Sequence, residues 1–360
     1  MLSKVMKMID MPKLVEGLLK SCRVEEGEKV AIVSTHMFPE SVVNAFMIAL
    51  VNFNADSLRV ILPPRIKEGK AISPVGPFAA ESLKMADMII TVYPEPVPGH
   101  LYEAPVPRVD MYSDYFVNWL KSGARILDVM LRIPEANLRR LYPTDALIRR
   151  SLAGAEMMEK AEKIRITSGA GTDLVLNKKG RKGACQKGVA SERGSWDNYG
   201  FGLVICAPLE DSANGTLVFD TGDYILGIGR IVTEPVKCTL KNGSITKIEG
   251  GSTAKIFEKW LATRGDERSY GVSHIGWGTH VEGAVWLESP FFSVADAESY
   301  PGVMQIAFGS NFFDTLARHS GIGGKNRAPS HCDVDLLNHD FYLDDELIVK
   351  EGKIVHPKCK

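Results

Sequence analysis

The sequence predicts an α/β fold in which an N-terminal parallel-sheet α/β domain, residues 1–164, is followed by a β-rich α+β domain, residues 165–360. Over the first 150 residues, apolar strand patterns alternate with helical patterns, which is typical of right-handed βαβ units and a parallel sheet. From about Arg165 onward, glycines become frequent and short β-rich runs follow one another. The length of 360 residues also favours two domains over one.

The N-terminal domain is predicted from four apolar runs and the helical segments between them. The predicted strands are 29–33, 57–62, 88–92 and 124–130, and the predicted helices are 38–51, 78–86, 114–121 and 143–164. Pro39 is compatible with the first turn of its helix, where the missing N–H is not needed. The amphipathic first 20 residues are predicted to form a surface helix rather than a signal peptide or a membrane span. No G-x-G-x-x-G motif follows the first strand, which disfavours a dinucleotide site.

The second half is predicted to consist of short strands joined by turns. The strands are expected at 172–176, 202–206, 215–219, 224–228, 236–240 and 244–248, with a helix at 255–263 and a closing hairpin at 346–355. Asn242-Gly243 separates two of these strand patterns, and this pair favours the tight turn of a β-hairpin.

Composition excludes several classes of protein. The 43 lysines and arginines nearly balance the 44 acidic residues, which argues against a nucleic-acid partner and against electrostatic binding to a membrane surface. The six cysteines form no C-x-x-C pair, so reduced thiols in a cytoplasmic protein are expected. No window of about 18 residues is continuously apolar, so no membrane span is predicted.

Two histidines and one aspartate of the second half are candidate metal ligands. His331 and Asp333 are two positions apart, so on a strand their side chains point to the same face. His274 supplies a second imidazole from a short apolar segment flanked by glycines. Two imidazoles and one carboxylate are typical of non-haem Fe(II) sites, because they leave coordination positions open. We therefore expect the second domain to be metal-binding, with Asp335 either as a further ligand or as a group that orients His331.

Other residues near these candidates are less favoured as ligands. His280 follows Gly276 and Gly278, which are expected to break the strand between it and His274. His319 opens a glycine-rich segment, residues 320–326, which we interpret as a loop that shapes or covers the site. Trp277 is expected in the core.

Several segments resemble landmarks of the aminopeptidase T-type metallopeptidases. They are Gly171-Thr172-Asp173-Leu174, the run from Ala207 to Gly215, the run from Gln305 to Gly309, and the segment that contains His331 and Asp333. The resemblance covers most of residues 165–356 and, more weakly, the first domain. It implies the fold of those enzymes.

At four positions the chain departs from the metallopeptidase pattern. Leu203 and His274 stand where those enzymes have glutamates, Gln305 where they have a histidine, and Phe312 where they have a tyrosine. A two-metal hydrolase needs bridging and terminal carboxylates to hold both ions and an activated water, so we expect peptidase chemistry to be lost. A metal-dependent peptidase or hydrolase is kept as the alternative prediction, and a metal-free binding protein on the same fold as a second one.

The same substitutions resemble the 2,5-dihydroxypyridine 5,6-dioxygenase family, whose iron-binding positions match His274, His331 and Asp333. The resemblance implies an extradiol-type ring-cleaving dioxygenase of nicotinate degradation that uses Fe(II) and O₂. Its expected substrate is 2,5-dihydroxypyridine or a similar hydroxylated heterocycle, and its expected product is N-formylmaleamate. The family also implies a homo-oligomer.

His100 is the candidate catalytic base, because a base must remove a substrate hydroxyl proton and histidine titrates near neutral pH. It lies in the loop after the strand predicted at 88–92, and loops at the carboxyl ends of parallel strands form ligand sites in α/β folds. Leu101, from the same loop, is a candidate substrate-binding residue beside His100. The other interpretation of His100 is a surface residue of a proline-rich loop.

Overall fold

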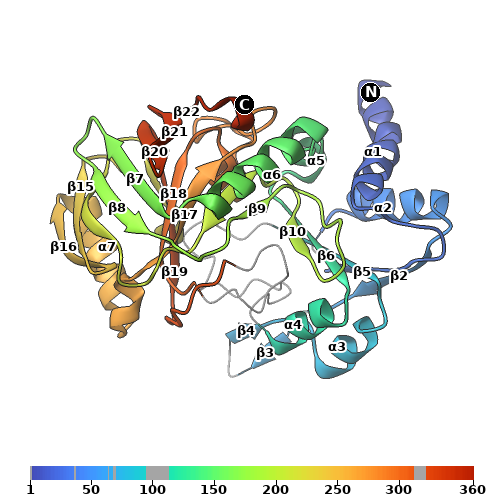
Figure 1. The fold of residues 1–360 in the computed structure, drawn as a ribbon. Helices are drawn as coiled ribbons and strands as arrows, with labels where there is room; N and C mark the ends of the chain where they lie inside the picture. The colour runs from blue at the N-terminus through green and yellow to red at the C-terminus, as the bar shows by residue number, and fades with distance from the viewer. Residues whose placement is uncertain (1, 36–37, 64, 68–69, 95–112, 312–321) are drawn as a thin grey trace.

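A computed structural model describes residues 2–35, 38–63, 65–67, 70–94, 113–311 and 322–360. It contains a parallel sheet in the N-terminal half and antiparallel sheets in the C-terminal half (Figure 1). The predicted α/β fold class is therefore confirmed. Among the described residues, no helix is long and apolar enough to cross a membrane.

The N-terminal half is built on a five-stranded parallel sheet with the order β10-β6-β5-β1-β2. Its strands are β1 (Lys29–Ser34), β2 (Asp56–Ile61), β5 (Met88–Pro94), β6 (Arg125–Leu131) and β10 (Trp196–Asn198). A separate short hairpin is formed by β3 (Arg65–Lys67) and β4 (Lys70–Ile72). Because β10 comes from the second half of the chain, the chain returns to the first sheet after residue 164. The domain boundary at that residue stays a prediction.

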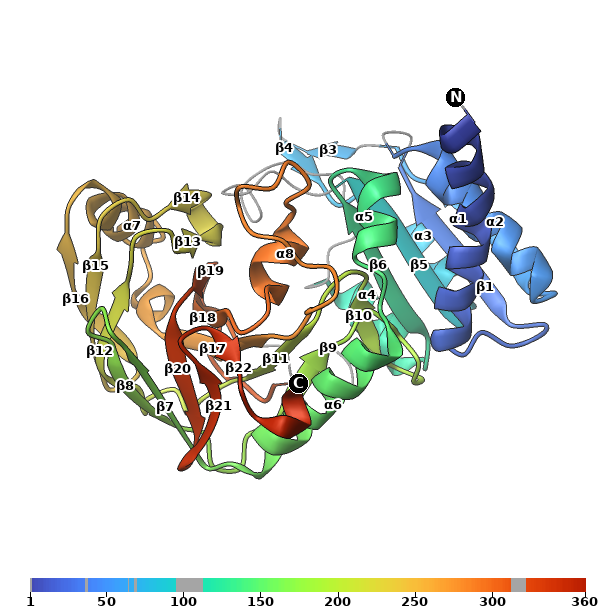
Figure 2. The same ribbon diagram turned by 90° about the horizontal axis from the view of Figure 1, so that it is seen from above.

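Helices cover both faces of this sheet (Figure 2), as its strands require, because they are apolar on both sides. The helices are α1 (Leu2–Ser21), α2 (Glu40–Asn52), α3 (Pro77–Leu83) and α4 (Asp114–Lys121). On β1, Val30 packs with α1 and α2, while its neighbour Ala31 packs with α3 and α4. Leu18 and Leu19 of α1 are buried in the first of these clusters while Lys13 and Lys20 are exposed, so α1 is an amphipathic surface helix, as predicted.

The C-terminal half contains two antiparallel sheets that pack face to face. One, which we call the site sheet, has seven strands in the order β14-β13-β19-β18-β17-β11-β9, and the outer sheet has eight in the order β16-β15-β12-β8-β7-β20-β21-β22. The strands of the site sheet are β9 (Ala184–Gln186), β11 (Leu203–Cys206), β13 (Tyr224–Ile225), β14 (Arg230–Ile231), β17 (Val272–Gly278), β18 (Met304–Gly309) and β19 (His331–Leu336). Those of the outer sheet are β7 (Lys163–Ser168), β8 (Asp173–Asn177), β12 (Asn214–Phe219), β15 (Val236–Lys241), β16 (Ser244–Gly250), β20 (His339–Leu343), β21 (Glu346–Lys350) and β22 (Lys353–Ile354). The other α-helices of the described residues are α5 (Pro134–Arg140), α6 (Asp145–Lys160), α7 (Ser252–Ala262) and α8 (Val294–Ser299).

The core lies between the site sheet and the outer sheet, and the opposite face of the site sheet carries polar residues. Along β19 the side chains alternate, and Cys332, Val334 and Leu336 enter the core. Trp277 of β17 is buried in the same core, with its ring centroid 5.1 Å from that of Phe341, as predicted. The other residues of β19 therefore point away from the core, toward the N-terminal half.

Two predicted elements are wrong in extent. The helix predicted over 143–164 ends at Lys160, and the strand β7 follows, in which the buried Ile164 and Ile166 alternate with exposed residues. That period of two favours a strand, and β7 pairs with both β8 and β20. The strand predicted over 224–228 stops at Ile225 and continues as a 3-10 turn, where Gly227 packs so closely on Cys332 that no side chain would fit.

Candidate metal centre

His331 and Asp333 lie side by side on the polar face of the site sheet. Both side chains are buried, and His331 Nε2 lies 3.1 Å from Asp333 Oδ1. They share this face because they are two residues apart on one strand. β19 is an inner strand between β13 and β18, so pairing on both sides holds the backbone that carries them.

His274 reaches the same face through an irregularity in β17. Val272 pairs with Phe308 and Ile275 with Ile306, so the two residues between them, Ser273 and His274, stand together opposite Ala307. This is a β-bulge, which inserts one extra residue and redirects side chains next to it. The bulge aims the imidazole of His274 toward the pair on β19.

The structure brings the three predicted ligand residues together. One ligand atom from each of His274, His331 and Asp333 lies within 4.8 Å of the others, and all three residues are buried. His274 Nε2 is 3.4 Å from Asp333 Oδ1, and the two imidazole rings are stacked with their centroids 5.1 Å apart. Donor atoms of both imidazoles and of the carboxylate thus converge on one point.

The charges of this group suit a cation. Burial lowers the pKa of His274 to about 4, because it disfavours the charged imidazolium. Burial also opposes ionisation of Asp333, but the charge and hydrogen bond of His331 outweigh it and lower the pKa of Asp333. For His331 the charge of Asp333 outweighs burial and raises the pKa. The carboxylate is therefore ionised and His274 neutral at neutral pH, which are the forms that bind metals.

Further polar side chains adjoin the group. Gln305 of β18 is fully buried, and its Oε1 lies 3.1 Å from His274 Nε2. Asp335 is fully buried as well, and neither of its carboxylate oxygens has a hydrogen-bond partner among the described residues. Glu298 of α8 is partly buried; burial, and then the charge of Asp333, raise its pKa well above the usual range. Glu298 was missed by the sequence argument, because nothing in its six-residue helix marks a link to β19.

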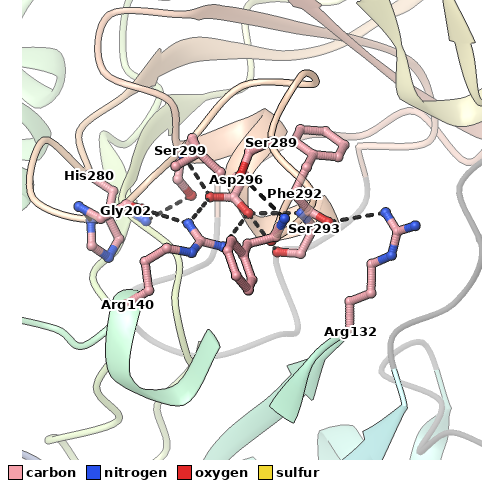
Figure 3. Close-up of polar contacts among 12 residues, drawn as sticks. Arg132, Arg140, Gly202, His280, Ser289, Phe292, Ser293, Asp296 and Ser299 are labelled. Carbon is pink, nitrogen blue, oxygen red and sulfur yellow. Dashed lines mark hydrogen bonds and ion pairs between the residues drawn. The ribbon is translucent and has the colours of Figure 1, made fainter. Parts of the chain in front are cut away.

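Two arginines of the N-terminal half hold α8 beside this face (Figures 2 and 3). Arg140, in the last turn of α5, pairs with both oxygens of Asp296 at 2.5 and 2.7 Å. Asp296 is completely buried. Arg132 donates a hydrogen bond of 3.1 Å to the carbonyl oxygen of Phe292, just before α8. These contacts set the position of α8, and with it that of Glu298.

The comparisons with known proteins cover nearly the whole chain and give the same enzyme family. A family model for 2,5-dihydroxypyridine 5,6-dioxygenase matches residues 10–356. The chain belongs to the 2,5-dihydroxypyridine 5,6-dioxygenase family. The 2,5-dihydroxypyridine 5,6-dioxygenase of Pseudomonas putida KT2440 is 30% identical over 357 residues, which cover 96% of each chain. A solved structure of 2,5-dihydroxypyridine dioxygenase from the same organism has a TM-score of 0.83 at 29% identity, and covers 98% of this chain and 99% of that one. This is a family of ring-cleaving dioxygenases.

The fold of this dioxygenase family is shared with aminopeptidase T. The solved structure of AmpT from Thermus thermophilus has a TM-score of 0.66, with 15% identity over 96% of this chain and 99% of that chain. The predicted resemblance to the aminopeptidase T fold is therefore confirmed. At this level of identity the likeness concerns the fold alone.

Two other residues that the sequence analysis considered, His280 and Asp335, are not ligands of this group. β17 continues through Gly276 but ends at Gly278, so His280 lies beyond the strand that carries His274, as predicted. His280 lies outside the ligand group, where its Nδ1 accepts a hydrogen bond from the backbone N–H of Gly283. Asp335 does not hydrogen-bond to His331; the carbonyl oxygen of Ser310 accepts from His331 Nδ1 at 2.8 Å instead.

Three predicted positions cannot be placed. His100 and Leu101, the candidate base and substrate-binding residue, lie outside the described residues. So does His319, at the start of the glycine-rich segment. Their roles stay predictions.

Proposed function

We propose that the protein is an Fe(II)-dependent dioxygenase that opens the ring of 2,5-dihydroxypyridine to give N-formylmaleamate. The observation that carries the proposal is the match to one dioxygenase family over residues 10–356, in a chain that also brings His274, His331 and Asp333 together. The same substrate appears in the names of the Pseudomonas putida relative and of its solved structure.

The donor set fits ferrous iron. Imidazole nitrogens and one carboxylate suit iron, and three protein ligands leave positions for a substrate oxygen and O₂. We infer that His274 and His331 would bind through Nε2, and Asp333 through a carboxylate oxygen. When bound, Fe(II) would supply the electron transfer between an electron-rich ring and O₂ that their direct, spin-forbidden reaction lacks. The chain itself contributes a buried polar face on which Asp333 is ionised and His274 is neutral, the forms that bind metals.

Substrate activation is assigned to the loop that follows β5. A hydroxyl of the ring must lose its proton before the ring becomes electron-rich enough to react, and His100 is the base that we infer for this step. Leu101 is inferred to pack against the ring. His100 follows β5 in the sequence, and α/β folds place their ligands at the carboxyl ends of parallel strands.

The test measures oxygen uptake and amide cleavage in one preparation. Iron-loaded protein receives 2,5-dihydroxypyridine in an oxygen electrode and a leucyl-anilide in a parallel assay. We expect equimolar uptake of O₂ and substrate, with both atoms of isotopically labelled O₂ in the product and no amide cleavage. Amide cleavage without oxygen uptake would contradict the proposal and favour the hydrolase alternative.

A further inference from the structure

Ser273 owes its position to the bulge in β17. In a regular strand, neighbours point to opposite faces, so Ser273 would enter the core while His274 faced the site. Instead the two residues stand together opposite Ala307. The side chain of Ser273 is completely buried and faces the two imidazoles rather than the core.

The hydroxyl of Ser273 contacts both histidines of the ligand group. Its Oγ donates to the carbonyl oxygen of Ser310 at 2.7 Å. It also lies 3.3 Å from His331 Nδ1 and 3.5 Å from His274 Nδ1. A hydroxyl has a single proton and two lone pairs. Because the proton is given to Ser310, only lone pairs are left to face the two Nδ1 atoms.

We propose that Ser273 is a positioning residue that keeps a proton on Nδ1 of both imidazoles and so leaves both Nε2 lone pairs for a metal. The inference rests on the proposed metal site. Two groups keep the proton on Nδ1 of His331, because this nitrogen also donates to the Ser310 carbonyl at 2.8 Å. For His274, either ring nitrogen could carry the proton without Ser273, because Gln305 Oε1 lies 3.1 Å from its Nε2 and favours a proton there. A proton on Nε2 blocks ligation.

A purely structural role would need only the hydrogen bond to the Ser310 carbonyl, and not the contacts with the two imidazoles. Burying a hydroxyl is unfavourable unless it is hydrogen-bonded, and an alanine would fill nearly the same space in the bulge. The chain offers a matched control in Ser151 of α6, which is also completely buried and bonds to Thr279 Oγ1 at 2.7 Å. Within the part of the chain that the structure describes, Ser151 forms no hydrogen bond with either imidazole.

The test is a titration of the metal-free protein with Co(II), followed by its visible spectrum and by competition with a chelator. Loss of an outer partner of a ligand typically weakens metal affinity about 10- to 100-fold, and we expect this for Ser273→Ala, together with a changed Co(II) spectrum. Ser151→Ala should bind within about threefold of wild type. Ser273→Thr, which keeps the hydroxyl, should recover most of the affinity. If Ser273→Ala fails to fold, Ser273→Cys repeats the test, since a thiol is a weak acceptor.

Wild-type affinity and an unchanged spectrum in Ser273→Ala would overturn the proposal. The titration uses neither O₂ nor substrate, so it separates this claim from the function proposed above. A wild-type protein that binds Co(II) but takes up no oxygen would refute the dioxygenase proposal. The Co(II) affinities of Ser273→Ala and wild type could still be compared. A wild-type protein that binds no Co(II) would overturn both.

Discussion

With His274 in place of a glutamate, the ligand group contains a single carboxylate, that of Asp333. The metallopeptidase pattern has a glutamate at this position, whereas a buried imidazole with a pKa of about 4 adds no charge at neutral pH. Asp333 is then the one ligand of the three that carries a negative charge. A group of this charge suits one divalent ion, because a second ion would need further carboxylates to offset its own charge. The nearby Asp335 and Glu298 do not meet that need, since burial raises the pKa of both.

His100 carries a prediction at the same scale. If it removes the hydroxyl proton of the substrate, His100→Ala should keep its metal but lose about 10²- to 10⁴-fold in kcat. Part of the rate should return at high pH, where the substrate ionises unaided. Steady-state oxygen uptake between about pH 6 and pH 10 measures this. A variant rate within about threefold of wild type at every pH would remove His100 from the site.

The sequence reaches some of these residues and not others. The spacing of His331 and Asp333 predicts a shared face, and the structure places them so. His274 was a candidate from its glycine-flanked apolar segment and from the resemblance, because no spacing links it to His331 and Asp333. The role of Ser273 could not be predicted from the sequence, because nothing in Val272–Gly278 indicates where the bulge inserts its extra residue. The strand ends at Gly278, as expected, but it continues through Gly276, because pairing on both sides of β17 overrides the low strand propensity of glycine.

At the scale of elements, α8 depends on partners that are distant in the sequence. The helix has six residues, too few to be stable alone. Ser293 and Asp296 form a capping box at its start, and Arg140 of α5 pairs with the same aspartate from 156 positions away. A short helix with this dependence could not be predicted from periodicity. The prediction for α6 was too long because it extended the helix into β7, which its period of two and its pairing with β8 and β20 define as a strand.

Arg140→Met tests this dependence. It leaves the buried carboxylate of Asp296 without its cation, which typically costs about 3–5 kcal/mol of unfolding free energy. Arg165→Met is the matched control, because the Arg165–Asp173 pair is exposed, with 50% and 62% of the side chains accessible, and such pairs contribute about 1 kcal/mol or less. Denaturant unfolding compares the two. Equal losses in both variants would show that the Arg140 pair does not hold α8.

Asp223, in the turn before β13, makes stability depend on pH. Its carboxylate accepts hydrogen bonds from the backbone N–H groups of Leu337 and Asp220, yet burial raises its pKa to about 7. The folded state thus holds the proton more tightly than the unfolded state, whose aspartates titrate near pH ~4. The stabilisation is full below pH ~4 and is lost as pH rises to about 7. Asp223→Asn should flatten this part of the stability profile, and identical profiles for variant and wild type would contradict the assignment.

At the scale of the whole molecule, the candidate site lies where the two halves meet. The polar face of the site sheet looks toward the N-terminal half, α8 stands between them, and β10 carries the chain back into the first sheet (Figure 2). Strand–helix alternation was enough to predict the parallel sheet, because its strands are joined by local crossovers. The pairing of β7 with β20 joins residues near 165 to residues near 341, and no local pattern encodes such a contact. That the chain forms a homo-oligomer stays a prediction.

The central claim is that one Fe(II) binds at His274, His331 and Asp333, and bound iron tests it most directly. Wild type, His331→Ala and His280→Ala are purified without oxygen, supplied with Fe(II), freed of excess metal and analysed for iron per chain. His280 is the control, because it is a buried histidine outside the ligand group. We expect close to one iron per chain in wild type and in His280→Ala, and almost none in a folded His331→Ala. Full iron in His331→Ala, or none in wild type, would contradict the account.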